Sequence, residues 1–282
     1  MQLSSADENT LPAVARLHFG AAGQVLESAV RRSVRLQRGE ACPAEDAGSR
    51  FGGTALLPPG HDWPRTGDGK PLSFLALVNT ADVQAPAEVP GLPADTLLGF
   101  FYEADEQQGW GFRPDDRQFS AVIPVPAASA VAVTAPPGAL TFPAYRMLPR
   151  TVTTIPDQDE PPLEELDADF TAYQRLSEDL EPDDKAPWHR MFGWPELVQS
   201  PMQLECQLAS SGLNVGGPEG YRDPRAAELA AGAADWLLLL QLDTDDALAW
   251  MWGDVGTIYY WIRRQDLLAG RFDQAWLIFQ CC

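Results

Sequence analysis

The chain has 282 residues, which corresponds to roughly two average domains or to one elaborate β domain. Apolar residues make up 45% of it, enough for a sizeable core, and 23 Gly with 25 Pro indicate many turns. Twenty basic and 40 acidic side chains give a formal net charge of −20. Nucleic acid and anionic lipid repel such an acidic chain, so we expect neither as a partner.

The N-terminus and the cysteines indicate the compartment. The first ten residues, MQLSSADENT, carry acids where a signal peptide needs cations, and no apolar segment follows. The longest strongly apolar run, residues 236–240, is far shorter than the roughly 20 residues that span a bilayer. Cys42 and Cys206 are isolated and Cys281 adjoins Cys282, without zinc-site spacing. We expect a cytoplasmic protein with reduced thiols, although the adjacent pair leaves a redox role open.

The first half of the chain alternates apolar segments with turns. Apolar residues at three- and four-residue spacing predict an amphipathic helix over residues 9–26. Strands are predicted over residues 33–36, 72–78, 97–102 and 120–125. Gly and Pro dominate residues 51–64, so we expect an ordered loop there and no regular element.

The middle of the chain, residues 127–187, is less regular. Short strands are predicted over residues 145–148 and 152–155, interrupted by Pro149. An apolar stripe with acids on the opposite face predicts a surface helix over residues 163–176.

The last third of the chain again reads as mainly strand. Residues 211–220 form the most flexible-looking segment, and residues 222–232 are compatible with a short helix. Strands are predicted over residues 236–242, 250–252, 257–262 and 276–280. Residues 266–270 are expected to form a turn or a single helical turn.

A weak internal repeat relates two parts of the chain. Residues 71–80 align with 235–244, 96–102 with 256–262, and 119–125 with 275–281. Phe51-Gly52 aligns with Phe192-Gly193 at an offset of 141. Four matches in the same order suggest an ancient duplication. Three-strand units seldom bury their faces alone, so we expect two halves, about residues 30–126 and 188–282, to pack as one body. Residues 127–187 connect the halves, and residues 1–29 are expected to form a helix packed on this body.

The same segments resemble a known family. The resemblance rests on Phe51-Gly52-Gly53, Trp63-Pro64, Trp252-Gly253-Asp254 and residues 71–75, 99–102, 189–195, 235–243, 256–262 and 275–281. In order and spacing they resemble the YwqG-like family, a bacterial domain-of-unknown-function family, number 1963, over about residues 30–282. The resemblance implies a mainly β, roll-like fold and no activity. The chain has Leu77 where the family commonly has Gln, although the repeat partner Gln241 is present.

Three aspartates form the main candidate for a metal site. Asp243 and Asp245 lie between the strands predicted over residues 236–242 and 250–252, and Asp254 lies beyond the second of these strands. Clustered carboxylate oxygens suit a hard cation such as Mg²⁺ or Ca²⁺. However, the glycine and glutamate of an EF-hand loop are missing, and Asp and Thr also build turns by bonding their own backbone. We therefore expect a turn and keep the metal site as an alternative.

Aromatic and polar residues nearby are the candidates for ligand binding. Gly253 lets a ligand approach Trp252, and Asp254 can bind a cation or a sugar hydroxyl. More often, such a Trp fills the core and such an Asp caps a turn. His189 precedes the Phe-Gly-Trp-Pro loop, where a structural role competes with that of a general base. Gln241 and Tyr260 complete the candidate binding residues.

These observations favour a non-enzymatic binding protein. The sequence contains no nucleophile elbow, phosphate-binding loop or dinucleotide-binding motif, so no catalytic set and no cofactor are predicted. An acidic surface suits a basic protein partner, and an immunity-type inhibitor is one concrete version. One alternative is a small-molecule binder with a pocket between the halves near Trp252. Another is a metal-dependent hydrolase that uses Asp243, Asp245 and Asp254, with His189 as a further candidate.

Overall fold

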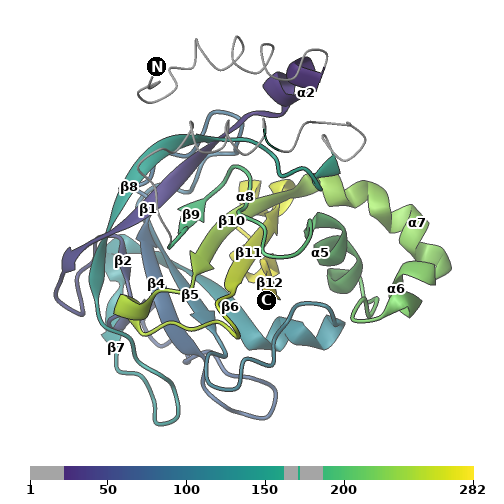
Figure 1. Cartoon of the computed structure of the whole chain (residues 1–282). Helices are drawn as coiled ribbons and strands as arrows, with labels where there is room; N and C mark the ends of the chain where they lie inside the picture. The colour runs from purple at the N-terminus through teal and green to yellow at the C-terminus, as the bar shows by residue number, and fades with distance from the viewer. Residues whose placement is uncertain (1–21, 162–170, 172–186) are drawn as a thin grey trace.

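The computed structural model describes residues 22–161, 171 and 187–282. Ten of its strands pair in antiparallel fashion into one sheet in the order β12-β11-β10-β9-β1-β8-β2-β4-β5-β6. This sheet curves into a nearly closed, barrel-like body (Figure 1), and β3 pairs with β7 in a separate small sheet. The expected mainly β fold is confirmed.

The strands occupy the following residues. The first eight are β1 (Arg31–Ala41), β2 (Arg50–Phe51), β3 (Ala55–Leu57), β4 (Ser73–Asn79), β5 (Thr96–Tyr102), β6 (Ser120–Pro126), β7 (Val131–Val133) and β8 (Tyr145–Thr154). The last four are β9 (Arg190–Met191), β10 (Trp236–Asp243), β11 (Thr257–Arg263) and β12 (Trp276–Gln280).

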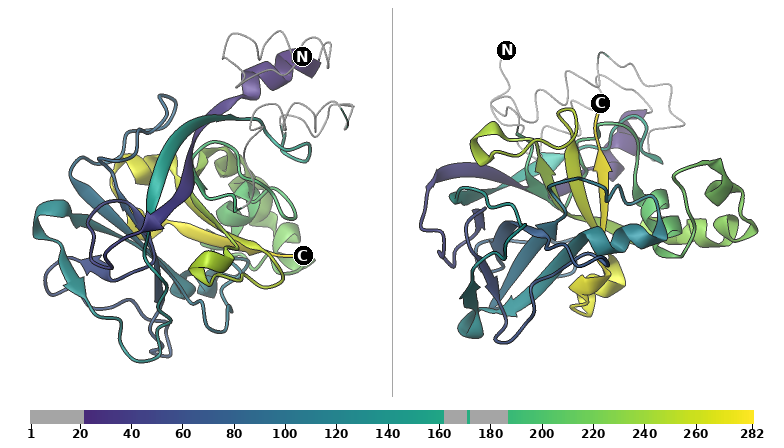
Figure 2. Two further views of the ribbon diagram at one scale, coloured as in Figure 1. Left: turned by 60° about the vertical axis from the view of Figure 1, so that its left-hand side comes forward. Right: turned by 90° about the horizontal axis from the view of Figure 1, so that it is seen from below.

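The helices are short and lie outside the sheet. The α-helices described are α2 (Ala22–Ala29), α5 (Gln203–Ser210), α6 (Pro218–Arg222), α7 (Pro224–Ala230) and α8 (Arg264–Leu268). The 3₁₀ helices are η1 (Pro114–Phe119), η2 (Ala127–Ser129), η3 (Ala231–Asp235), η4 (Asp246–Leu248) and η5 (Phe272–Gln274). Figure 2 shows α5, α6 and α7 standing out from one side of the body, where α5 packs on β10 and β12. No helix in these described ranges has the length and apolar character needed to cross a membrane.

The predicted apolar runs form strands because both of their faces are buried. On β4, Val78 faces the large central core, whereas Leu77 belongs to a second cluster with residues of β3. On β10, Leu240 faces the central core, and Leu238 packs with residues of α5. A strand covered on both faces needs apolar side chains at every position, and this explains the lack of alternation in the sequence.

The prediction that Pro149 interrupts a strand is wrong, because β8 runs through it without a break. The Leu36 N–H donates to the His189 carbonyl (2.9 Å), so the backbone groups of Leu36 face β9 and make no bond to Pro149, its register partner. The nitrogen of Pro149 therefore faces the opposite side of β8, where β2 pairs only with Tyr145 and Arg146. At that open edge the missing N–H costs no ladder bond.

Other expectations need correction. Residues 51–64 include the end of β2 and all of β3, because strands of two and three residues fit between the surrounding Gly and Pro. The strand predicted over residues 250–252 is a loop, and α5 was not predicted. Most of the helix predicted over residues 9–26 lies outside the described residues, as does that over residues 163–176 apart from residue 171.

Two hairpins of the sheet share local features. β4–β5 and β10–β11 each carry a register shift, at Leu75 and at Leu239. Arg50 and Arg190 start short strands beside these hairpins, and each donates to the carbonyl oxygen of the fourth residue after it. This local correspondence has an offset of 140, one less than the offset of the sequence alignment. Duplication itself stays a prediction.

Candidate functional site

The loop over residues 244–256 covers one end of the barrel and carries the predicted ligand residue Trp252. Trp250 and Trp252 are almost completely buried and belong to the central core. The Trp252 indole N–H donates to the Asp243 carbonyl (3.2 Å), and its ring lies 5.9 Å from that of Tyr102 and 5.6 Å from that of Trp250. Trp252 therefore anchors the loop by filling the barrel.

His189 lies beneath this loop and is fully buried. Its Nδ1 accepts the Asp243 N–H (3.0 Å), and its Nε2 lies 3.4 Å from Asp245 Oδ2. An acceptor at Nδ1 requires that Nε2 carries the proton of the neutral ring and points it at Asp245. The rings of Phe51 (4.7 Å) and Trp250 (5.7 Å) enclose the imidazole.

Burial sets the protonation of this pair. It lowers the pKa of His189 and outweighs the nearby Asp245, so the imidazole is neutral at pH 7. Burial acts to raise the pKa of Asp245, but the hydrogen bond from His189, the Ala247 N–H and the Arg38 guanidinium together lower it. Arg38 Nε lies 3.4 Å from Asp245 Oδ2, and the Arg38 side chain is partly exposed to solvent. The contact between Arg38 and Asp245 joins β1 to the loop over residues 244–256. Neither of the two cavities described below is lined by His189, Asp245 or Arg38.

Gln241 and Tyr260 also make structural contacts. The Gln241 amide accepts from the Glu196 N–H (2.9 Å) and donates to the Trp188 carbonyl (2.7 Å). The Tyr260 hydroxyl donates to the Phe101 carbonyl (2.9 Å) and joins β11 to β5 across the barrel. Both side chains are fully buried.

The three candidate metal ligands do not gather at one point. Asp243 accepts hydrogen bonds from the Trp188 N–H (2.8 Å) and the Thr257 hydroxyl (2.9 Å), Asp245 faces His189, and Asp254 is exposed. Within residues 22–161, 171 and 187–282, no group of three or more His, Cys, Asp or Glu side chains could hold a metal ion. The described residues thus supply no geometry for the hydrolase alternative.

The exposed surface beside Asp254 combines apolar and acidic side chains. We call it the loop face, and define it by Asp105, Glu106, Trp110, Met251, Asp254 and Val255. Trp110 is 38% exposed, Met251 48% and Val255 59%, values that are high for large apolar side chains. Of these residues, only Asp254 was predicted from the sequence, because nothing in the sequence distinguishes an exposed apolar residue from a buried one.

A glutamine clamp holds the two loops of the loop face together. Gln107 donates to the Met251 carbonyl (2.9 Å) and accepts from the Gly253 N–H (2.8 Å). The Glu103 carboxylate shapes the first loop by accepting the N–H groups of Glu106 (2.7 Å) and Gln108 (2.9 Å). Because these hydrogen bonds already fix the two loops, the loops lose little conformational entropy when a partner binds the exposed apolar side chains.

Trp110 continues this surface toward the C-terminal strand. Its ring stacks on Phe279 (4.4 Å between centroids), and a side chain at Gly253 would meet the same Phe279 ring at 2.9 Å. Trp110 and the Gly253 turn therefore flank one phenylalanine. Trp110 also lines a cavity of about 490 Å³ with Phe112 and Phe119.

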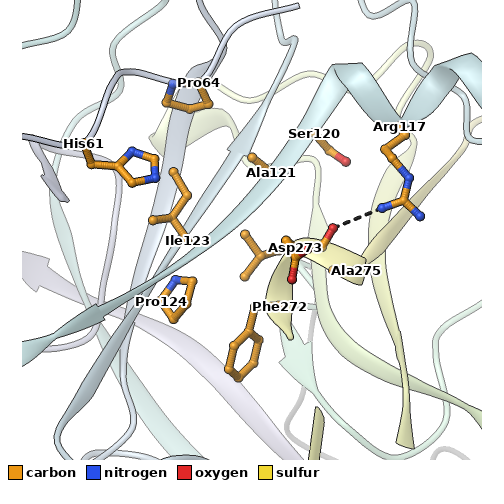
Figure 3. A pocket seen from close by; sticks show the side chains of 11 residues that line it. His61, Pro64, Arg117, Ser120, Ala121, Ile123, Pro124, Phe272, Asp273 and Ala275 are labelled. Carbon is orange, nitrogen blue, oxygen red and sulfur yellow. Dashed lines mark hydrogen bonds between the residues drawn. The ribbon is translucent and has the colours of Figure 1, made fainter. Parts of the chain in front are cut away.

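A second cavity of about 270 Å³, which we call the seam cavity, lies between the two halves, at β6 (Figure 3). Pro64 and Ile123 line it from the first half, and Phe272 and Asp273 line it from η5 in the second. Its position differs from that of the pocket predicted near Trp252.

Comparison with models of protein families identifies the family of the chain. A family model described as "Domain of unknown function (DUF1963)" matches residues 49–281. No curated protein matches the chain significantly.

Proposed function

The chain belongs to the DUF1963 family of domains of unknown function, and from this premise we propose that it is a non-enzymatic protein that binds a basic protein partner through the loop face. The observation that carries the proposal is the joint exposure of Trp110, Met251 and Val255 on one acidic surface. Aromatic and Met side chains are enriched in protein interfaces, and Trp is among the residues that most often dominate the binding energy.

The charge of the chain supports a basic partner. Asp105, Glu106 and Asp254 are exposed around the apolar side chains, and the whole chain has a net charge of −20. Lys70 neutralises part of the negative charge of the loop face, because it pairs with Glu106 (2.8 Å). A negative surface accelerates the encounter with a positive partner and disfavours negative ones. An immunity-type inhibitor of a cationic protein is one form of this function.

Site-specific photo-crosslinking in cells tests the position of the surface. A photoreactive phenylalanine analogue replaces Val255 in one variant and Leu268 in a matched control, because Leu268 is also exposed but lies beyond the opposite end of β11. We expect a basic protein to be captured at position 255 only. Capture of the same proteins at both positions, or of none, would contradict the proposal.

Titration calorimetry with the captured partner tests the chemistry. The double charge reversal D105K/D254K should weaken binding by at least about tenfold and flatten its dependence on salt. The double reversal E219K/E228K changes two exposed acids, on α6 and α7, by the same total charge and is the control. Equal losses in the two variants would show that overall charge, and not the loop face, determines binding.

A further inference from the structure

The seam cavity lies where the barrel is incompletely closed. β6 ends the sheet on one side and β12 ends it on the other, so that, among the described strands of this sheet, β6 pairs with β5 alone. The cavity lies along the open side of β6 (Figure 3), with Arg117 and Ser120 at one end and Pro124 at the other.

Two hydrogen bonds fix the direction of the β6 backbone groups. The Glu103 N–H donates to the Phe119 carbonyl, and the Ala127 N–H donates to the Asp95 carbonyl, both at 2.9 Å. Both bonds continue the β5–β6 register, in which every residue of β6 has one partner. Because successive residues of a strand face opposite sides, the odd-numbered residues of β6 bond to β5 and the even-numbered ones face the seam.

The residues facing the seam allow only a short pairing. They are Ser120, Val122, Pro124 and Pro126, and the two prolines have no N–H to donate. Val122 and Ser120 keep both a donor and an acceptor on this side. An added strand can therefore pair with about two residues of β6 before the prolines stop it.

Arg117 supplies a positive charge at the Ser120 end. Its Nη1 donates to the Asp273 carbonyl (3.0 Å), and its guanidinium lies 5.2 Å from the centre of the Trp276 ring. Within the part of the chain that the structure describes, Nε and Nη2 have no hydrogen-bond partner. These two donors form the planar fork that binds a carboxylate through two parallel hydrogen bonds.

The walls of the seam cavity are mostly apolar, although His61 and Asp273 also line it. Pro64, Ile123 and Phe272 line it, and its volume of about 270 Å³ is close to the lower end of ligand-binding pockets. It therefore has room for an apolar side chain beside the polar edge of β6.

We propose that the seam cavity binds the carboxyl terminus of an extended peptide. The terminal carboxylate binds Arg117, the main chain pairs with Val122, and an apolar side chain packs on Ile123 and Phe272. With the carboxylate at the Ser120 end, the peptide runs antiparallel to β6. Strand addition supplies affinity through main-chain bonds, and the cavity supplies specificity. Basic residues further from the peptide terminus are favoured by the net charge of −20.

Two immobilised peptide pools test this site with the full chain. Both contain pentapeptides with two lysines at the attached end and varied apolar residues at the last three positions. One pool ends in a free carboxylate and the other in an amide. The free-carboxylate pool should bind at least about tenfold more tightly, because only a carboxylate forms the charge-assisted pair with Arg117. Equal binding of the pools, or binding of neither, would overturn the proposal.

Three variants test the roles of the edge and of the guanidinium. Arg117→Gln should lose at least about tenfold in affinity, and Arg113→Gln, which removes an exposed arginine just before η1, should not. Val122→Pro should abolish binding, because it removes the N–H that pairs with the peptide main chain. Equal binding by the two arginine variants would contradict the proposal even if Val122→Pro fails to fold.

Free leucine separates a peptide site from a small-molecule site. It has the carboxylate and the side chain but cannot extend along β6, so it should compete with the peptides at least about tenfold more weakly than an unlabelled pentapeptide. Competition of equal strength would show that strand pairing contributes nothing and would overturn the proposed mode.

Discussion

At the scale of single residues, the burial of His189 should make the stability of the protein depend on pH. Burial lowers its pKa below the usual value near 6.5, so the unfolded chain takes up a proton in acid before the folded chain does. Stability should therefore fall as pH drops below about 6.5, with a slope of at most about 1.4 kcal/mol per pH unit. His189→Gln should remove this slope in urea titrations between pH 7 and 5. His61→Gln, at an exposed histidine, is the control, and equal slopes in both variants would contradict the prediction.

Glu160 should act in the opposite direction. It is fully buried and accepts hydrogen bonds from Gln203, and burial raises its pKa to about 7. The folded chain thus holds a proton that the unfolded chain has already lost, and the resulting stability disappears as pH rises through about 7. Glu160→Gln should make the free energy of unfolding less dependent on pH between about 5 and 8, with Asp159→Asn as the exposed control. An unchanged pH profile in Glu160→Gln would show that this carboxyl is not protonated in the folded state.

At the scale of elements, the open strand β6 is protected by its prolines. Pro124→Val adds a third consecutive N–H on the side that faces the seam, because Val122 and Ser120 already have theirs. Unpaired strand edges recruit other strands, so this variant should self-associate more strongly than the unmodified chain. Sedimentation velocity measures the change, and Pro59→Val in an exposed loop is the control. Identical sedimentation of both variants would mean that neighbouring elements already shield β6.

Several elements followed from local sequence and several did not. β4, β5, β10 and β11 were predicted because continuous apolar runs are encoded within seven or eight residues. Pro149 misled the prediction of β8, since only its distant pairings decide whether a missing N–H matters. Trp250 and Trp252 look like a strand in sequence but close the barrel from a loop.

At the scale of the whole molecule, the net charge of −20 should itself lower stability. Like charges repel more strongly in the compact state than in the unfolded chain. Raising NaCl from about 10 mM to about 150 mM shortens the screening length from roughly 30 Å to 8 Å, so the melting temperature should rise. Sucrose at matched osmolarity controls for general solute effects. A melting temperature that falls with salt would show that ion pairs such as those of Arg271 and Asp266 outweigh the repulsion.

The candidate site was only partly accessible from sequence. Asp254 and the excess of acids were recognised, because charge and turn chemistry are properties of single residues. The exposure of Met251 and Val255 depends on Gln107, which lies 144 residues before Met251. The free guanidinium donors of Arg117 matter only because η5 lies across the seam from β6.

By itself, the sequence determined the mainly β class, the position of most strands and the acidic character of the chain, since these follow from residue type and short-range periodicity. Only the tertiary structure decided that the sheet leaves a seam between β6 and β12, and that Trp252 and His189 are buried in the core. Closure and exposure depend on contacts between residues far apart in the chain, and no local pattern encodes those contacts.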